Sequence, residues 1–243
     1  MTGPAYLPLS RDGRLAARAR EALARLSSCV LCARRCGADR TQGIRRASCR
    51  IGRHAIVHSV GPYDGGGGAI VFAGCNMRCL FCDIAEASWD GKGEEADAES
   101  LAGHMLALQQ RGHRCIALVS PSHVAAQIVE AVAIAAQRGL TVPLAWDSGG
   151  YDSPEGLALM DGVVDFYLPD AKFGDSTVAR QLAGVTGYVD ANRAAIAEML
   201  RQVGPGGVLV RHLRLPHGLA GTEAVLAGLP EGVAVEVRDD YRP

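Results

Sequence analysis

The sequence predicts an α/β fold, a partial (β/α)6 TIM-like barrel preceded by a helix and a cysteine-rich segment. Two observations lead to this prediction. From residue 69 onward, short apolar runs alternate with helical patterns, which is typical of βαβ units. The strand runs are almost continuously apolar, as expected for parallel strands that are covered on both faces. Six such strands with right-handed crossovers would curl into an incomplete barrel.

The chain before the barrel contains a helix, a cysteine-rich stretch and a short strand. Apolar residues recur at helical spacing between residues 11 and 26, with arginines between them, which predicts an amphipathic helix. A stretch rich in Cys, Arg and Gly, without clear periodicity, follows from Cys29 to Cys49. Residues 55–60 then have the pattern of a short strand.

A run of four glycines, Gly65–Gly68, separates this front part from the first strand of the barrel. Glycine is conformationally permissive, and we interpret the run as a flexible link between two parts of the chain. We therefore expect a front segment over residues 1–60 and a barrel domain over residues 61–243.

The barrel strands are predicted over residues 69–73, 115–119, 141–146, 163–168, 207–213 and 233–237. Helical patterns separate them and carry recognisable end signals. Asp97 can cap one helix, which Gly112 ends, and Pro121 begins another, which Gly139 ends. Ser153–Glu155 combines an N-cap serine, a proline at the first helical position and an early acidic residue.

Composition excludes several classes of function. The net charge is −1 and no dense Lys/Arg tract occurs, so we expect neither nucleic-acid nor membrane-surface binding. The N-terminus lacks the pattern of a signal peptide, and no apolar run is long enough for a membrane span. We therefore expect a cytoplasmic protein, in which eight cysteines indicate metal or cluster binding rather than disulfides.

Three cysteines follow the first barrel strand at close spacing. Cys75, Cys79 and Cys82 provide three soft thiolates in one loop, with the aromatic Phe81 beside the last of them. Such ligands select zinc, cuprous copper or iron–sulfur clusters, but a structural zinc site takes four closed ligands. Three protein ligands fit a four-iron cluster with one iron left open for a small molecule. The alternative is a plain disulfide or zinc loop.

Four further cysteines lie in the front segment, at Cys29, Cys32, Cys36 and Cys49. The segment between them is too poor in apolar residues to fold by itself, and a metal would supply the missing folding energy. Four thiolates suit either zinc or an auxiliary [4Fe-4S] cluster, and the sequence leaves both open.

Polar residues follow successive barrel strands, at the point where each strand ends. In parallel βα barrels, chemistry takes place at this carboxyl edge, so we expect these residues to converge there. They are Cys75, Ser120, Asp147 with Ser148, Asp170 with Lys172, and Arg211 with His212.

Five runs of sequence resemble the radical S-adenosylmethionine (SAM) superfamily, and in particular its uncharacterised proteins related to pyruvate formate-lyase activating enzyme. The runs are Cys29–Gly37, Gly74–Cys82 with its C-x3-C-x2-C spacing, Leu118–His123, Tyr167–Lys172 and Val210–Pro216. The resemblance extends over nearly the whole chain. Relatives usually have Asn-Thr-Ser-Gly after the third strand; Asp147–Gly150 instead resembles the Asp-Thr-Asn-Gly of glycyl-radical activases.

The resemblance implies a role for each of these residues. Cys75, Cys79 and Cys82 would hold a [4Fe-4S] cluster whose open iron binds SAM, and Phe81 would contact the adenine of SAM. Ser120, with Ser122, would offer neutral oxygens to the methionyl amino group. The alternative for Phe81 is a core aromatic residue.

The remaining residues would bind the SAM carboxylate or the substrate. Two carboxylates near the SAM carboxylate would repel it, so we expect a sodium or potassium ion held by Asp147, Ser148 and Asp170. Lys172 would pair with a carboxylate of SAM or substrate, and Arg211 and His212 would contact SAM or substrate. We expect Lys172 and His212 to act in catalysis. The alternatives are a helix cap for Asp147, a solvated loop residue for Lys172 and a core residue for His212. We expect Cys115, inside a strand, to be a small buried side chain.

The resemblance implies an oxidoreductase that cleaves SAM reductively to a 5′-deoxyadenosyl radical, which abstracts hydrogen from a substrate. Within this class we consider first an activase that places a glycyl radical on a partner enzyme, and second a modifier of a small metabolite or peptide. A third hypothesis, from another class, is a non-catalytic iron–sulfur electron-transfer protein. Expected partners are SAM and a reductant such as flavodoxin or ferredoxin.

Overall fold

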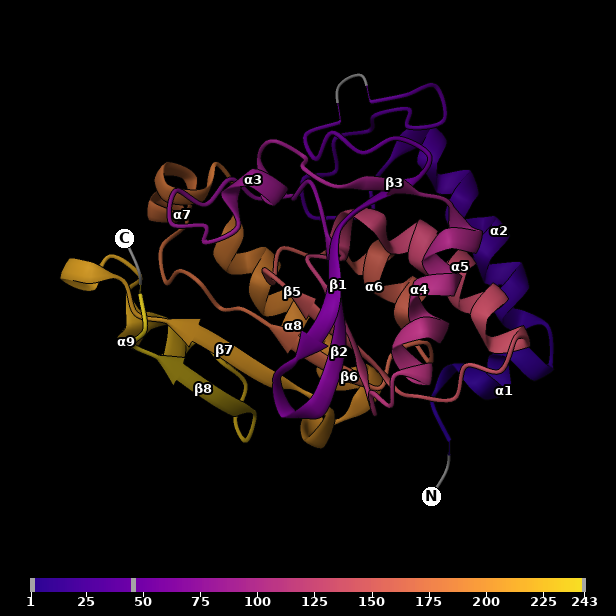
Figure 1. Cartoon of the computed structure of the whole chain (residues 1–243). Helices are drawn as coiled ribbons and strands as arrows, with labels where there is room; N and C mark the ends of the chain where they lie inside the picture. Colours follow the sequence, from indigo (N-terminus) through magenta and orange to yellow (C-terminus); the bar gives the residue numbers. More distant parts are fainter. Residues whose placement is uncertain (1–2, 45–46, 242–243) are drawn as a thin grey trace.

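The fold is known from a computed structural model that describes residues 3–44 and 47–241 (Figure 1). Its helices are α1 (Tyr6–Arg11), α2 (Arg14–Ala24), α3 (Ala85–Ser88), α4 (Ala98–Gln110), α5 (Ala125–Gln137), α6 (Pro154–Met160), α7 (Ser176–Ala183), α8 (Tyr188–Val203) and α9 (Thr222–Ala227). Its strands are β1 (Ala55–Tyr63), β2 (Gly67–Phe72), β3 (Glu94–Ala96), β4 (Ile116–Val119), β5 (Leu144–Ser148), β6 (Phe166–Pro169), β7 (Leu209–Leu213) and β8 (Ala234–Arg238).

All six predicted barrel strands are present, with shifted ends, as β2, β4, β5, β6, β7 and β8. The first four form consecutive parallel pairs, and β7 pairs with β8 in parallel. Isolated bridges from Tyr167 to Val208 and from Asp170 to Arg211 join the two groups. The chain is therefore a mixed α/β protein with a sheet in which parallel pairing dominates.

Closure of this sheet into a barrel is not confirmed. In the described part of the chain, the strand order is β3-β1-β2-β4-β5-β6, with β7 and β8 beyond the isolated bridges. The sheet therefore ends at β3 on one side and at β8 on the other. Strands β1 and β3 pair antiparallel and extend the first edge, a feature absent from the predicted barrel.

The interpretation of the glycine run as a flexible link is wrong. Gly65 and Gly66 adopt φ values of 68° and 79° in a tight turn, and Gly67 and Gly68 already belong to β2. The run therefore closes an antiparallel β1–β2 hairpin, in which Tyr63 pairs with Gly67. Strand β1 continues past the expected domain boundary at residue 60.

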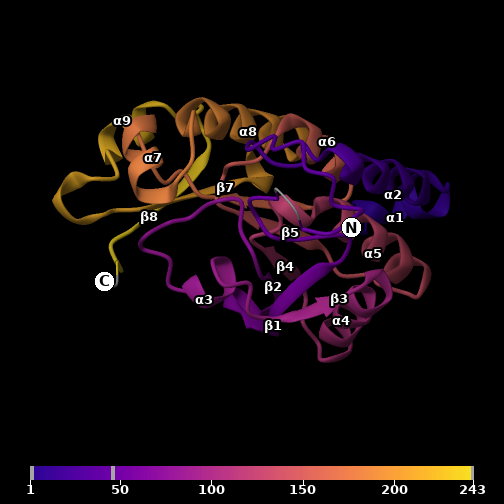
Figure 2. The same cartoon turned by 90° about the horizontal axis from the view of Figure 1, so that it is seen from above.

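The helices cover one face of the sheet. Alternate strand side chains point toward them, and Ile70, Leu118, Trp146 and Tyr167 are almost completely buried. Helices α4, α5, α6 and α8 lie along this side (Figure 2), and α1 and α2 pack outside α5. The opposite face is lined by small residues from neighbouring strands, Ala69, Ala117 and Ala145.

The predicted helix ends are largely confirmed. The side chain of Asp97 accepts a hydrogen bond from Ser100 N at 2.8 Å, and that of Ser153 accepts one from Gly156 N at 3.0 Å. Pro154 is the first residue of α6. The predicted front helix is α2, which continues into a short 3₁₀ turn and buries its apolar side.

Candidate active site

The three-cysteine loop begins directly after β2, at Gly74. Gly74 has a φ of 69°, and a Cβ at this position would lie 2.4 Å from the carbonyl oxygen of Cys49, so only glycine fits. The loop is held to α7 by backbone hydrogen bonds from Arg78 N and Leu80 N, each 2.8 Å long. The loop thus lies at the carboxyl edge of the parallel strands, as predicted, and contacts the front cysteine segment.

The loop thiols are free and partly accessible. Met77 N–H lies 3.4 Å from Cys75 Sγ, and Cys82 Sγ lies 3.3 Å from the hydroxyl of Ser88. Burial, with smaller contributions from the other two thiols of the loop, raises the pKa of the Cys79 thiol to about 12. The Lys172 ammonium acts in the opposite direction on Cys79. The three thiols therefore lie near one another and near a cation.

The front thiols also lie near one another. Cys29, Cys32 and Cys49 are buried and Cys36 is exposed. Burial, with smaller contributions from the other three thiols, raises the pKa of Cys32 to about 12. All eight cysteines are free, so the disulfide alternative is not realised.

The donor sets fit a soft metal, because each group consists of thiols gathered in one place. Within residues 3–44 and 47–241, however, no group of three or more Cys, His, Asp or Glu side chains has the arrangement of a metal site. Metal binding therefore remains a prediction for both groups.

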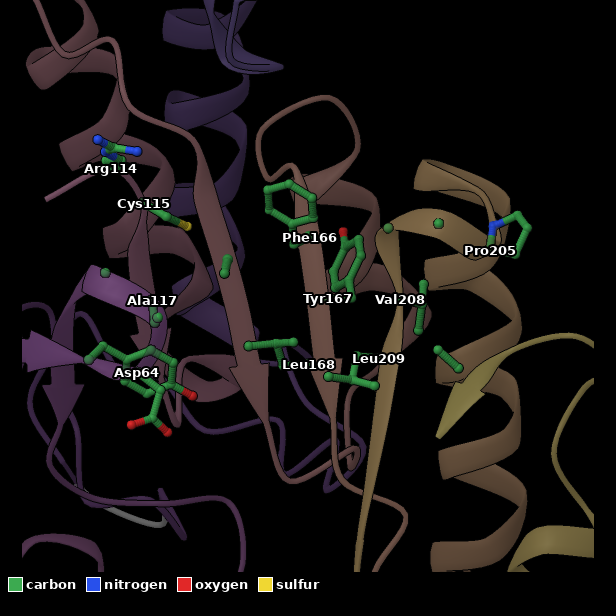
Figure 3. Close-up of a pocket in the computed structure, with 17 residues that line it drawn as sticks. Asp64, Arg114, Cys115, Ala117, Phe166, Tyr167, Leu168, Pro205, Val208 and Leu209 are labelled. Atoms are coloured by element: carbon green, nitrogen blue, oxygen red, sulfur yellow. The ribbon is translucent and has the colours of Figure 1, made fainter. Parts of the chain in front are cut away.

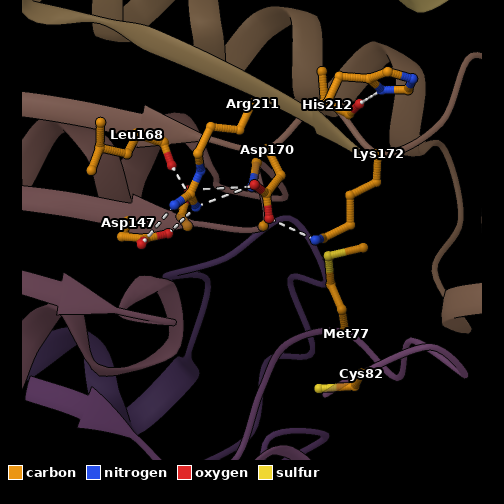
Figure 4. A network of polar contacts seen from close by, with 12 residues as sticks. Met77, Cys82, Asp147, Leu168, Asp170, Lys172, Arg211 and His212 are labelled. Carbon is orange, nitrogen blue, oxygen red and sulfur yellow. Dashed lines mark hydrogen bonds and ion pairs between the residues drawn. The ribbon is translucent and has the colours of Figure 1, made fainter. Parts of the chain in front are cut away.

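Two carboxylates and two cations form a continuous network beside the cysteine loop (Figure 4). Arg211, on β7, binds both oxygens of Asp147 at the end of β5, with 3.0 Å between Nη1 and Oδ2. The same guanidinium lies 3.2 Å from Asp170 Oδ1. Lys172 Nζ binds the other Asp170 oxygen at 2.6 Å. Tyr63, from the end of β1, donates a 2.5 Å hydrogen bond to Asp147.

This network argues against the expected sodium or potassium ion. The ion was expected because the two carboxylates would repel the carboxylate of SAM, but Arg211 lies between Asp147 and Asp170 and neutralises them together with Lys172. Although burial opposes ionisation, Lys172 and Arg211 hold the pKa of Asp170 below its usual value. Asp147 is a strand residue and caps no helix.

Lys172 and Phe81 lie together on the cysteine side of the network. The Lys172 ammonium is 6.0 Å from the centre of the Phe81 ring and only partly exposed, unlike a solvated loop lysine. Phe81 packs edge-on against Phe173, which packs in the same way against Tyr188. The Tyr188 hydroxyl accepts from Lys172 N at 2.9 Å and donates to nearby carbonyls, which fixes the loop after β6.

The predicted serines do not join this network. Ser148 donates a 2.6 Å hydrogen bond to Asp152, a buried carboxyl that the sequence did not single out. Burial raises the pKa of Asp152, while hydrogen bonds from Ser148, Ser122 and Trp146 oppose the rise. Ser120 adopts a φ of 56°, and among the described residues its hydroxyl has no hydrogen-bond partner.

His212 lies in the protein interior, where the core-histidine alternative would place it, and not in the polar network. Arg211 and His212 are neighbours in β7, so their side chains leave opposite faces of the strand. His212 is fully buried, with Nδ1 2.6 Å from Ala171 O and Nε2 2.9 Å from the hydroxyl of Thr222. Both ring nitrogens thus bind groups of the protein interior.

A His212→Leu variant tests this correction. We expect its free energy of unfolding to fall by about 1–3 kcal/mol, because the Thr222 hydroxyl and the Ala171 carbonyl lose their partner. Denaturant unfolding measures this loss. SAM affinity per folded molecule should stay at the wild-type value. A large loss of affinity would show that His212 contributes to SAM binding.

A cavity of about 380 Å³ lies on the alanine-lined face of the sheet (Figure 3). Ala117, Ala145 and Leu168 form part of its wall, and Tyr63 is shared with the carboxylate network. Cys115 lies one residue before β4 and also lines the cavity, so it is not a fully buried side chain. A volume of this size can hold a small organic molecule.

No family model matches the chain. An uncharacterised protein of Methanocaldococcus jannaschii, MJ0674, is 26% identical over 191 residues, which cover 72% of this chain and 53% of that protein. The chain thus spans about half the length of this curated relative. A radical SAM methyltransferase from Sphaerobacter thermophilus aligns with a TM-score of 0.49 and 14% identity, over 72% of this chain and 56% of that one. In the described ranges, no helix combines the length and apolar character of a membrane span.

Proposed function

We propose that the chain is a radical SAM enzyme whose cluster is held by Cys75, Cys79 and Cys82. The observation that carries the proposal is the position of this C-x3-C-x2-C loop. It lies at the carboxyl edge of a parallel sheet, with Lys172 and Phe81 beside the thiols. A non-catalytic electron-transfer protein would not need this adjoining polar network.

The bound cluster and SAM would supply one-electron cleavage to methionine and a 5′-deoxyadenosyl radical. The residues of the chain bind and orient. Lys172 keeps its charge because Asp170 raises its pKa above the usual value, against the effect of burial, so the ammonium can hold a carboxylate of SAM or substrate. The rings of Phe81, Phe173 and Tyr188 form an apolar wall that excludes water from this side.

Among the possible targets, the cavity favours a small molecule. It opens toward the amino-terminal ends of β2, β4, β6 and β7 and reaches the network through Tyr63, and its largely apolar wall suits an uncharged organic group. The resemblance to glycyl-radical activases includes the Asp147–Gly150 run. In this structure the Asp147 carboxylate pairs with Arg211. The activase hypothesis, in which the radical is placed on a protein partner, is examined by the same experiment as the small-molecule hypothesis.

The test is reductive cleavage of SAM. Anaerobically reconstituted protein, supplied with dithionite and SAM, should form 5′-deoxyadenosine and methionine in equal amounts, as measured by chromatography. A reduced cluster signal in electron paramagnetic resonance that SAM leaves unchanged, without cleavage products, would support the electron-transfer alternative instead. A protein-borne glycyl radical signal on adding a candidate partner would favour the activase.

The cavity gives a second prediction within this proposal. Ala117→Leu or Ala145→Leu would place a larger side chain in the wall of the 380 Å³ space, next to the residues packed on that face. Such variants should weaken binding of a cavity ligand by about tenfold or more. SAM cleavage without substrate should be unchanged. Isothermal titration with compounds found by ligand screening measures the first quantity, and equal affinities in variant and wild type would exclude the cavity as the substrate site.

A further inference from the structure

Arg40 is a fully buried arginine in the front cysteine segment, with 0% of its surface exposed. Its guanidinium donates to the carbonyl oxygens of His123 at 2.6 Å, Ile51 at 2.8 Å and Gly52 at 3.3 Å. Its fourth partner is a thiol, with 3.5 Å between Nη1 and Cys29 Sγ. Arg40 therefore has satisfied hydrogen bonds but only neutral partners as the protein stands.

The positive charge of Arg40 has no carboxylate partner among residues 3–44 and 47–241. Asp39, its neighbour in sequence, is the sole acidic residue between Cys29 and Arg53, and its carboxylate binds Thr41 at the surface. The stretch from Cys29 through Arg53 contains seven arginines. An arginine cannot lose its proton in a protein, and a buried charge without a counter-charge is costly.

Among the described groups that surround Arg40, only the cysteine thiols can become negatively charged and so balance the charge of the guanidinium. His123, from the turn after β4, is fully buried; burial and Arg40 lower its pKa to about 3, so the ring is neutral. Backbone carbonyls carry only partial charges. The cysteines remain, because Cys29 Sγ lies 3.5 Å from the Arg40 guanidinium.

We propose that Cys29, Cys32, Cys36 and Cys49 bind one metal centre as four thiolates, and that Arg40 is its buried counter-ion. Each thiol releases its proton to solvent on binding. Zn²⁺ with four thiolates and a [4Fe-4S]²⁺ cluster with four thiolates both carry a net charge of −2. Either centre would neutralise Arg40, and the hydrogen bond to Cys29 would become charge-assisted. The proposal uses a different set of cysteines from the radical site and does not depend on the proposed function.

The test isolates the front cysteines in the full chain by replacing Cys75, Cys79 and Cys82 with serine. The metal-free protein is titrated anaerobically with Co²⁺, whose thiolate absorption reports coordination by sulfur, and then with Zn²⁺ in competition. We expect one tetrathiolate site. Arg40→Gln should weaken Zn²⁺ affinity by about tenfold or more, whereas Arg40→Lys, which keeps the charge, should weaken it much less.

Arg53→Gln is the matched control, because Arg53 lies in the same segment but already pairs with Glu130 at 3.1 Å. Its Zn²⁺ affinity should stay at the value of the parent. Equal losses for Arg40→Gln and Arg40→Lys would mean that Arg40 acts only through its hydrogen bonds, and would overturn the counter-ion assignment. A folded parent that binds neither Co²⁺ nor, after reconstitution, iron and sulfide would overturn the metal centre itself.

Iron, sulfide and zinc contents of the parent separate the two possible centres. About four irons per chain indicate the cluster, and one zinc with almost no iron indicates the structural ion. Circular dichroism checks the fold of each variant. If the triple-serine parent does not fold, the same comparison is made in the single Cys82→Ser background. Failure of SAM cleavage would leave this test unaffected.

Discussion

A Cys82→Ser variant is expected to form no 5′-deoxyadenosine above background in the dithionite assay. Cys82 is the third thiol of the loop after β2, and a serine hydroxyl is a poor ligand for the soft iron of a cluster. Removal of one of three ligands should leave a cluster that is lost or cannot be reduced at its usual potential. Iron analysis and electron paramagnetic resonance measure the cluster, and chromatography measures the product.

The control for this prediction is Asp83→Asn, a change of one exposed residue in the same loop. This variant should keep the product yield of the wild type, which separates loss of a ligand from disturbance of the loop. Equal product from Cys82→Ser and wild type, at equal protein concentration, would remove the three-cysteine loop from the chemistry.

Replacing Arg211 with methionine should lower the free energy of unfolding by about 3–5 kcal/mol, because it leaves a buried carboxylate without its partner. Arg211 joins three strand ends, through Asp147 on β5, Asp170 after β6 and Tyr63 on β1. Lys172 can still neutralise Asp170, so most of the cost should arise at Asp147. Denaturant unfolding monitored by circular dichroism gives the size of the loss.

Two further variants identify the cause of this loss. Arg201→Met removes an arginine of an exposed ion-pair cluster on α8 and should change stability by only about 0–1 kcal/mol. In the double variant Asp147→Asn/Arg211→Met, the buried carboxylate is gone, so part of the stability should return. An Arg211→Met protein as stable as Arg201→Met would show that the network contributes little to folding.

The parallel strands could be predicted from the sequence because each is a short apolar run between well-marked helix ends. The helix caps at Asp97 and Ser153 could also be predicted, because a cap depends only on residues that are close in the sequence. The glycine run was misinterpreted because glycine permits both a flexible link and a tight turn. Only the pairing of β1 with β2 distinguishes a tight turn from a flexible link. This pairing depends on the residues on both sides of the turn.

At the candidate site, the positions of the strand ends were predictable but the partners of the side chains were not. Strand alternation does separate Arg211 from His212 and Asp147 from Ser148, because neighbours in a strand face opposite sides. This alternation predicts that only one residue of each neighbouring pair faces the network. No sequence pattern indicated that Tyr63 would bind Asp147, or that Asp147 and Asp170 would share Arg211. These contacts depend on the tertiary arrangement of strands far apart in the sequence.

The β1–β2 hairpin also determines how the two cysteine groups come together. Cys49 precedes β1 and Cys75 follows β2, and the register pairs Val57 with Phe72 at the end of the ribbon nearest to both. Closing a short loop costs little chain entropy, and this cost grows only slowly with loop length. The chain between the two groups is folded back on itself by a turn of a few glycine-rich residues. The entropy needed to bring Cys49 beside the three-cysteine loop is therefore largely that of forming a single local hairpin.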